Sequence, residues 1–464
     1  MEFFFNPRGI AVAGATPNRK KGGYAILFNA IQGFKGSIYP VNPRYDEIEG
    51  IPCFPSIMDI PDPVDMAILF VPAPAVPDMA TQCARRGIRG IIVESGGFSE
   101  VGAEGGSLQA QLHHIARKTG LRVWGPNCMG LIDTATQTVF SFVSPTIWEN
   151  GLTRGGVSLI VQSGMLSGGF LIDAMTHGDT GFSKVCSLGN KMDVNECEIL
   201  EYLLKDPDTQ TVGLYLESFV DGRRFMDICA GSDKPVVVLK GGKSAGGARA
   251  AMSHTASLAG NQQVVSGALA QAGVVEATDF KQMIDLCRGL ADTAPSQGTS
   301  QGRIAVLTYT GAGGIVSADF MEDTGLTLAP LSPETLDTLK TVYPPWMPPA
   351  NPLDLWPAME RHGPLKAVAV ALQAVCTDPN VDGVLLHSFV GAIMSSGDLE
   401  QAATAIRSAG KPVFCWLMGA KGEIHKFKDV ARAHGIPVYR ELRRAVECLA
   451  AFFQYQKTRG VHPT

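Results

Sequence analysis

The chain has 464 residues, of which 45% are hydrophobic, and 39 basic against 44 acidic side chains give a formal net charge of −5. A chain of this length usually folds as about three domains, and this apolar content suffices for several cores. The acidic balance gives no electrostatic basis for nucleic-acid binding, although local loops can still bind small anions.

The N-terminus carries the apolar run Phe3–Phe5, which is too short for a signal sequence. No run approaches the ~20 apolar residues of a membrane span, so no membrane association is expected. The ten cysteines are scattered singly without a C-x-x-C pair, which predicts reduced core residues rather than disulfides or a zinc site. These features predict a cytoplasmic protein without a metal site of its own.

One pattern recurs along the whole chain: a short apolar run, a Gly-rich turn and a helix-like segment. The apolar runs lie at residues 9–14, 64–71, 90–95, 121–124, 156–161, 212–217, 235–239, 303–307, 381–386 and 412–416. Continuous apolar strands that alternate with helices predict parallel sheets covered on both faces. The expected fold class is therefore α/β, with ligands at the carboxyl ends of the strands.

Two segments have the character of domain boundaries. Residues 133–155 are polar, lack a helical period and precede a new strand, whereas residues 292–302 have the composition of a flexible linker. The sequence therefore predicts three domains, at residues 1–135, 150–292 and 303–464.

The first strand leads into the turn Gly14–Gly23 and then a helix. Backbone amides and the helix N-terminus can hold phosphate here, but the G-x-G-x-x-G spacing of ordinary dinucleotide binding is absent. Lys20 and Lys21 either pair with phosphates or are solvated lysines. Further turns on the same sheet edge are expected at residues 40–43, 71–74 and 95–98.

The second predicted domain opens with a strand that ends in Gln162, Ser163 and Gly164. A Ser-Gly turn at the start of a helix offers free N–H groups to an anion. A hydrolase nucleophile elbow needs Gly two residues before the Ser, where this chain has Val161, so that reading is excluded. A plain N-cap is the alternative, and it is compatible with phosphate binding.

The stretch Lys240–Gly260 is rich in Gly, Ala and Ser and contains a single histidine, His254. An imidazole in a flexible, positively charged loop is a candidate nucleophile for a phosphoryl group, and an ordinary surface loop is the alternative. Glu217 ends an earlier strand and can accept the Nδ1 proton of a histidine, which leaves Nε2 as nucleophile. A helix cap or surface carboxylate is the alternative for Glu217.

These motifs, in this order, resemble the α subunit, or α part, of the ADP-forming acyl-CoA synthetases of the succinyl-CoA synthetase superfamily. The resemblance covers essentially the whole chain, and its motifs are weak singly but specific as an ordered set. It rests on residues 14–16, 39–43, 71–73, 95–98, 125–130, 162–164, 189–191, 253–255, 310–314 and 351–354. It implies an N-terminal Rossmann-like CoA-binding domain followed by two flavodoxin-like, doubly wound domains.

The resemblance also implies a set of site residues. The phosphate would lie at Gln162, Ser163 and Gly164. The CoA site implied by the family comprises Gly14, Ala15, Thr16, Lys21, Val41, Asn42, Val71, Pro72, Ser95, Gly96 and Asn127.

The mechanism implied by the family begins with attack of phosphate on acyl-CoA, which gives acyl phosphate and free CoA. His254 takes the phosphoryl group and releases the carboxylic acid, while Glu217 steadies the histidine. The loop then moves to a nucleotide site, where ADP becomes ATP. Such a transfer depends on positioning and charge neutralisation, and a Gly/Ala/Ser-rich loop suits the required movement.

The sequence departs from the family pattern at Thr16, Val161 and Ala256, where Ser, Ser and Gly are common. None of these changes removes a group that the chemistry needs, although Ala256 can stiffen the loop. No length remains for the family's ATP-grasp module. The resemblance thus implies an oligomer with an ATP-grasp β subunit that carries ADP or ATP and Mg²⁺, or a partner-free relative with only the acyl-CoA half-reaction.

Two other classes of function are weighed against this enzyme. A non-catalytic CoA-binding or acyl-CoA-sensing protein has no need for the pair Glu217 and His254. A C–C lyase of the citrate-cleaving kind needs a citrate-synthase-like region, for which the chain has no room. The sequence does not name the carboxylic acid.

Overall fold

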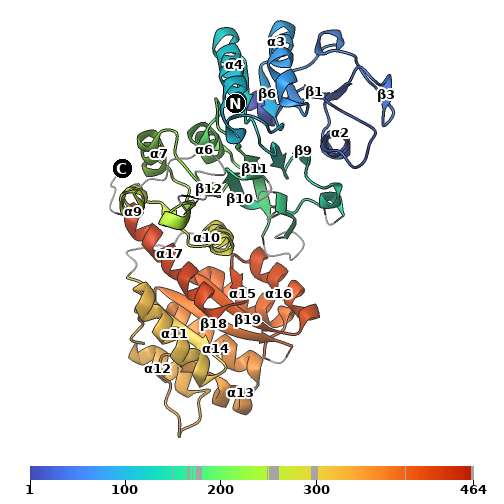
Figure 1. Ribbon diagram of the computed structural model, residues 1–464. Coiled ribbons are helices and arrows are strands. Elements are labelled where there is room, and N and C mark those ends of the chain that lie inside the picture. The colour runs from blue at the N-terminus through green and yellow to red at the C-terminus, as the bar shows by residue number, and fades with distance from the viewer. Residues whose placement is uncertain are drawn as a thin grey trace. The chain divides into compact units, whose positions relative to one another are not determined.

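The structure is a computed structural model whose described residues fall into two compact units, Met1–Met283 and Ile284–Thr464 (Figure 1). It describes residues 1–149, 151–164, 168–169, 171–173, 180–247, 249, 261–293, 301–391 and 393–460. Parallel sheets with helices confirm the predicted α/β class.

The first sheet is parallel and has the order β2-β1-β5-β6-β7, which is the 2-1-3-4-5 succession of a doubly wound sheet. Alternate side chains of β1 enter two cores: Ile10 and Val12 pack with one helix, and Ala11 and Ala13 pack with two others. This explains the continuous apolar runs in the sequence. The strands are β1 (Gly9–Ala13), β2 (Ser37–Val41), β5 (Met66–Leu69), β6 (Gly90–Val93) and β7 (Arg122–Trp124); the helices are α2 (Gly22–Gly33) on the first face and α3 (Val76–Arg86) and α4 (Ala103–Thr119) on the other.

The second sheet repeats this succession in its parallel part and adds an antiparallel hairpin next to β11, in the order β14-β13-β12-β10-β11-β8-β9. Its strands are β8 (Leu131–Asp133), β9 (Thr138–Phe140), β10 (Arg154–Val161), β11 (Phe182–Ser187), β12 (Thr211–Leu216), β13 (Val236–Lys240) and β14 (Val275–Glu276). Helices of this part of the chain are α6 (Glu196–Lys205), α7 (Gly222–Ala230), α9 (Gln262–Gln271) and α10 (Phe280–Asp292).

The first two sheets share one unit because side chains join them. Asn29 of α2 is fully buried and donates to the carbonyls of Ser141 and Val143, both at 2.9 Å. On β7, Arg122 pairs with Asp193 and Glu198, both at 2.9 Å. The turns that end the strands of the first sheet are therefore held in a fixed relation to the second sheet.

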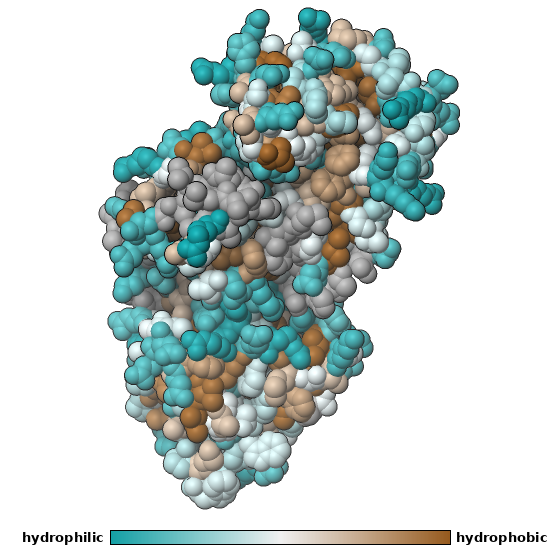
Figure 2. Space-filling view, viewed as in Figure 1, coloured by the Kyte–Doolittle hydropathy of each residue, from teal (hydrophilic) through white to brown (hydrophobic). Residues whose placement is uncertain are grey.

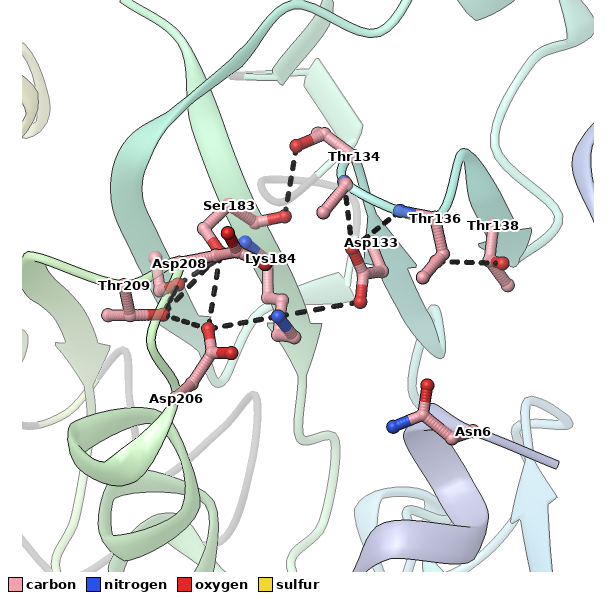
Figure 3. A network of polar contacts seen from close by, with 12 residues as sticks. Asn6, Asp133, Thr134, Thr136, Thr138, Ser183, Lys184, Asp206, Asp208 and Thr209 are labelled. Carbon is pink, nitrogen blue, oxygen red and sulfur yellow. Dashed lines mark hydrogen bonds and ion pairs between the residues drawn. The ribbon is translucent and has the colours of Figure 1, made fainter.

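A buried ion network joins the β8–β9 hairpin to the parallel part of the second sheet (Figure 3). The ammonium of Lys184 on β11 lies 2.9 Å from Asp206 and 3.4 Å from Asp133 of β8. Burial alone would raise the pKa of Asp206, but hydrogen bonds from Thr209 and Lys184 outweigh burial and hold it below its ordinary value. The network therefore favours the charged carboxylate in the folded state.

The third sheet belongs to the second unit and again has the 2-1-3-4-5 succession, as β16-β15-β18-β19-β20, with β17 paired to β15. Its strands are β15 (Arg303–Thr308), β16 (Thr327–Leu328), β17 (Leu353–Asp354), β18 (Gly383–Val390), β19 (Val413–Gly419) and β20 (Val438–Tyr439). Its helices are α11 (Gly311–Thr324), α12 (Pro333–Lys340), α13 (Trp356–His362), α14 (Pro364–Thr377), α15 (Ser396–Ala409), α16 (Lys421–Ala433) and α17 (Leu442–Gly460). The other α-helix and β-strands of the described residues are α1 (Glu2–Phe5), β3 (Glu47–Ile48) and β4 (Ile51–Pro52), and short 3-10 helices lie at η1 (Ile57–Asp59), η2 (Ala73–Ala75), η3 (Ser99–Val101) and η4 (Pro145–Trp148).

The three-domain division at 1–135, 150–292 and 303–464 stays a prediction. Strands β8 and β9 lie on either side of residue 135, and the limit between the compact units falls inside α10. Most of the predicted linker 292–302 lies outside the described residues.

Hydrophilic residues dominate the face drawn in Figure 2, with hydrophobic residues scattered among them. Scattered apolar side chains are normal on a protein surface. No helix in the described part of the chain is long and apolar enough to cross a membrane.

Candidate functional site

The turns that follow the strands of the first sheet lie on one edge, as the sequence predicts. Gly14 follows β1 with φ +88°, and a Cβ atom there would lie 2.2 Å from the Phe70 carbonyl oxygen, so the close approach requires glycine. The side-chain amide of Asn42, after β2, donates to the Ala15 carbonyl at 2.8 Å. Thr16 is also buried in this turn. The β1 and β2 turns are thus joined.

Ser95 joins the other turns of this edge. Its hydroxyl donates to the Val71 carbonyl at 2.6 Å and accepts from the Val71 amide at 3.0 Å. The Ser95 carbonyl accepts from the amide of Asn127, which has φ +58° and follows β7. The turns after β5, β6 and β7 therefore form one connected surface.

The predicted CoA residues divide by exposure. Ala15, Thr16, Val41 and Ser95 are buried and shape the turns. The residues on the exterior are Lys21, Pro72, Gly96 and Asn127. The structure places all of these positions on or beside one sheet edge, and their contact with CoA stays a prediction.

On the second sheet, Gln162 and Glu217 follow the neighbouring strands β10 and β12. The Gln162 side-chain carbonyl accepts from the Glu217 amide at 2.8 Å and from the Ser218 amide at 3.3 Å. Both side chains are buried, with 7% and 6% exposed. The order of strands reverses between β10 and β12, which is where doubly wound sheets bind ligands.

Two buried lysines donate hydrogen bonds to the main chain of the same segment. Lys240 donates to the Glu217 carbonyl at 2.7 Å and to the Gly241 carbonyl, while Lys191 donates to the Ser218 carbonyl at 2.6 Å. Burial lowers the pKa of both lysines, and the neighbouring carboxylates Glu196 and Glu217 oppose that shift. The backbone at Glu217 is therefore fixed by three side chains.

The carboxyl group of Glu217 also has a side-chain neighbour. The Tyr215 hydroxyl donates to Glu217 Oε1 at 3.4 Å. Burial and the charge of Glu217 raise the pKa of Tyr215 to about 12, so the hydroxyl keeps its proton. A Cβ atom at Gly241 would lie 2.9 Å from the Tyr215 hydroxyl, so the turn after β13 passes close to this side chain.

The predicted phosphohistidine loop begins at this turn. Lys243 pairs with Glu276 at 2.6 Å, and the Ser244 hydroxyl accepts from the Gly247 amide at 3.0 Å. His254 lies outside the described residues. The sequence suggests that lysines of this stretch attract an anion, whereas Lys240 and Lys243 bind groups of the protein itself.

Ser163 and Gly164 begin the segment after β10 and are half-buried. A Cβ atom at Gly164 would lie 3.2 Å from Met129, which belongs to the 125–130 loop after β7. The Met129 amide donates to the Ser187 hydroxyl at 2.9 Å. The predicted phosphate turn of the second sheet is therefore in contact with the last loop of the first sheet.

The third sheet has a neutral polar network where β15 and β18 lie side by side. Buried His387 contacts the Thr308 hydroxyl through Nδ1 at 2.9 Å and the Ser317 hydroxyl through Nε2 at 3.1 Å. Burial lowers the pKa of His387 to about 3, so the ring is neutral. A Cβ atom at Gly313 would lie 3.0 Å from His387 Nδ1, so the glycines after Thr310 allow close packing of α11 on the sheet.

Sequence reasoning included Lys191 and Lys240 in its motifs but did not predict that their ammonium groups bind main-chain carbonyls. It missed the buried polar residue His387, whose partners come from distant segments of the chain. Glu94 is another, because it sits inside an apolar run next to Ser95.

Two family models match parts of the chain. The model of a CoA-binding domain matches residues 8–134, and that of a succinyl-CoA ligase-like flavodoxin domain matches residues 154–290. The first match contains the whole first sheet and β8, and the second contains the parallel part of the second sheet.

Curated relatives extend the likeness to the whole chain. An Archaeoglobus fulgidus acetate–CoA ligase [ADP-forming] II is 38% identical over 98% of this chain and 67% of its own length. The α subunit of a Pyrococcus furiosus acetate–CoA ligase [ADP-forming] II is 34% identical over 99% of both chains. A solved Korarchaeum cryptofilum acetyl-coenzyme A synthetase 1, in complex with phosphate and ADP, aligns with TM-score 0.88 at 30% identity over 99% of this chain and 97% of that chain.

These findings define an acid–thiol ligase with a CoA-binding domain. The chain belongs to the family of ADP-forming acetate–CoA ligases, within the succinyl-CoA synthetase superfamily.

Proposed function

We propose that this chain is the α part of an ADP-forming acyl-CoA synthetase. It interconverts acyl-CoA, phosphate and ADP with a carboxylic acid, CoA and ATP, through an acyl phosphate and a phosphohistidine at His254. Acetate is the first acid to test, because relatives of full or greater length are named acetate–CoA ligases.

In this proposal CoA binds along the carboxyl edge of the first sheet. The backbone of Gly14, Ala15 and Thr16 meets the phosphates of CoA at the start of α2, with Lys21 beside them. The turns after β2, β5, β6 and β7 continue the site through Asn42, Val71, Pro72, Gly96 and Asn127. The rigid links through Ser95 support this role, because a preformed surface loses little entropy on binding.

Phosphate binds at the turn Gln162–Gly164 in the same proposal, where the amides of Ser163 and Gly164 open a helix. From there it attacks the acyl carbon of acyl-CoA. The contact between Gly164 and Met129 supports the proposal, since it brings the phosphate turn next to a loop of the CoA edge.

Glu217 orients His254 for the second step. Its backbone is fixed by Gln162 and Lys240, so its carboxylate has a defined position from which to accept the Nδ1 proton of an imidazole. His254 Nε2 then attacks the acyl phosphate, takes the phosphoryl group and releases the acid. This arrangement of Gln162, Lys240 and Glu217 at the switch point of a doubly wound sheet is the observation that carries the proposal.

The nucleotide step belongs to a partner. Two Pyrococcus furiosus relatives of 99% coverage are named α subunits, whereas the single-chain relatives from Archaeoglobus fulgidus are longer than this chain. We therefore assign ADP or ATP and Mg²⁺ to an ATP-grasp β subunit in a hetero-oligomer.

The test is to incubate the purified chain with ³²P-phosphate and acetyl-CoA, and to measure acid-labile, alkali-stable label on the protein. Wild type is expected to be labelled and His254→Ala is not. His113→Ala is the matched control, because His113 is exposed on α4 and is expected to leave labelling unchanged.

A non-catalytic CoA-binding protein is the competing function. It predicts that CoA binds but that no acyl-CoA yields label, even when an ATP-grasp subunit from a relative is added. Label that survives in His254→Ala contradicts the assignment of the nucleophile.

A further inference from the structure

Glu94 is a buried carboxyl group for which the proposed mechanism has no role so far. It directly follows β6 and precedes Ser95 of the CoA edge, and only 3% of it is exposed. Its Oε2 atom accepts from the Phe142 amide at 3.1 Å. Its Oε1 atom is buried and has no hydrogen-bond partner among the described residues.

The orphan oxygen is aimed at the loop after β7. A Cβ atom at Gly130 would lie 2.6 Å from Glu94 Oε1, so this oxygen touches the end of the 125–130 loop. The Gly130 carbonyl accepts from the Ser187 amide at 2.9 Å, and the buried thiol of Cys128 donates to the Val93 carbonyl at 3.4 Å. These two hydrogen bonds join the loop to β11 and to β6, and they keep it next to the carboxyl group of Glu94.

Glu94 also stands between the two proposed binding turns. Its neighbour in the chain on one side is Ser95, whose hydroxyl joins the proposed CoA turns through Val71. On the other side Gly130 follows Met129, which contacts Gly164 of the phosphate turn. A group placed here can serve a reaction between CoA and phosphate.

Burial favours the protonated form of the Glu94 carboxyl group in the folded protein. Burial raises the pKa of Glu94 well above its ordinary value, and one hydrogen bond from the Phe142 amide does not compensate. Because Oε2 accepts that amide, the acid proton is favoured on Oε1. A buried polar atom without a partner costs about 1–3 kcal/mol, so the Oε1 atom of Glu94 does not stabilise the fold.

We propose that Glu94 is the proton relay of the thioester step, which protonates the departing sulfur of CoA and recovers a proton from the attacking phosphate. The inference rests on the proposed function. A phosphate oxygen forms a bond to the acyl carbon, the carbon–sulfur bond breaks, and its electron pair goes to sulfur. Glu94 gives its proton to that sulfur, directly or through a water, and the P–O–H group of hydrogen phosphate returns a proton to the carboxylate.

The balance of this step requires no further reagent. Acyl-CoA and hydrogen phosphate become acyl phosphate and the free thiol of CoA, and Glu94 ends as it began. In the reverse direction the same group takes the thiol proton while the sulfur attacks the acyl phosphate. A general acid with a raised pKa suits a thiol, because the two then exchange a proton at small cost.

The experiment compares two routes to the phosphoenzyme in Glu94→Gln, which keeps the shape and neutrality of the side chain but has no acidic proton. The first route uses acetyl-CoA with ³²P-phosphate and includes the thioester step. The second route uses ³²P-acetyl phosphate, from which His254 takes the phosphoryl group without any thiol. We expect labelling by the first route to fall about 10²–10⁴-fold, and labelling by the second to stay within about threefold of wild type.

Glu104→Gln is the matched control, since Glu104 is exposed in the first turn of α4 and is expected to label by both routes like wild type. Equal labelling by both routes in Glu94→Gln would overturn the relay. A wild type that labels by neither route would instead remove the proposed function itself.

Glu94→Asp covers the case in which Glu94→Gln does not fold, as judged by its melting curve and CoA affinity. It keeps an acidic proton but retracts it by one methylene. A selective fall of the first route in Glu94→Asp supports the relay, whereas an equal change in both routes assigns Glu94 a structural role and overturns the relay.

Discussion

The second and third sheets have the same succession of strands, but the groups buried at their carboxyl edges differ in charge. At the carboxyl edge of the second sheet, the charged side chains of Lys191 and Lys240 donate to the main-chain carbonyls of Ser218 and Glu217. In the third sheet, the region where β15 and β18 lie side by side contains a neutral network, formed by Thr308, Ser317 and His387.

The comparison shows how one fold provides two different environments. After the third strand of the succession, the second sheet has Glu217 and the third sheet has Gly391. Strand order sets where a site can form, and the residues at the strand ends set what it can do. We therefore expect charge changes to affect reaction and stability strongly in the second sheet and weakly in the third.

The largest effect is expected from Glu217→Gln, which makes the second edge neutral like the third. The backbone contacts of Gln162 and Lys240 remain, because they use main-chain atoms of Glu217. A neutral amide cannot stabilise the imidazolium or fix its tautomer, so the rate of phosphoenzyme formation should fall about 10³-fold or more. Single-turnover labelling measures this rate, and a wild-type rate would remove Glu217 from the mechanism.

A smaller effect, on stability, is expected from Lys184→Met in the network of Figure 3. The substitution leaves Asp133 and Asp206 buried without their cation, so the free energy of unfolding should fall by about 3 kcal/mol.

The third sheet, in the second unit, offers the matched comparison, Arg303→Met. Arg303 is partly exposed, and its partner Asp382 keeps hydrogen bonds from the Gln301 and Arg303 amides. We expect a loss of at most about 1 kcal/mol there. Urea unfolding measures the loss of unfolding free energy in Lys184→Met and in Arg303→Met. Equal losses in the two variants would contradict the contrast between the sheets.

The smallest effect at neutral pH, which grows only in acid, is the pH dependence of the stability of the second unit. The pKa of His387 is about 3 in the folded state against 6.5 ordinarily, so between these values the unfolded chain binds the additional proton. Its contribution is fully present above pH 6.5 and is lost as the pH falls toward 3, with a slope of up to about 1.4 kcal/mol per pH unit. Urea unfolding from pH 7 to pH 4 should show this slope in wild type and a reduced slope in His387→Gln. Identical slopes would show that the folded state takes up this proton as readily as the unfolded chain, so that the pKa of His387 is not lowered by burial.

The sequence predicts the apolar strands well because their burial on two faces leaves a continuous signal. The runs at 90–95 and 235–239 became β6 and β13 with small shifts at their ends. The hairpin β8–β9 was not predicted, since its polar residues are satisfied inside the fold. Asp133 caps the turn by accepting the Ala135 amide at 2.9 Å, and Thr134 donates to the Phe182 carbonyl at 2.5 Å.

The site shows the same limit. Strand-end turns place Gln162 and Glu217 on one edge, which the sequence anticipates. The Gln162 side chain can bind the Glu217 amide only because β10 and β12 are neighbours in the sheet. No local sequence pattern predicts that these two strands pair. The burial of Lys240 and the orphan oxygen of Glu94 likewise arise only from packing between distant segments.

Mapping the phosphoryl group tests the central claim most directly. Trypsin should release residues 250–281, a peptide whose single histidine is His254. After incubation with acetyl-CoA and phosphate, mass spectrometry at neutral pH is expected to find this peptide carrying one phosphoryl group on His254, lost on mild acid treatment. A phosphoryl group on another peptide, an acid-stable one on Ser or Thr, or none at all would contradict the account.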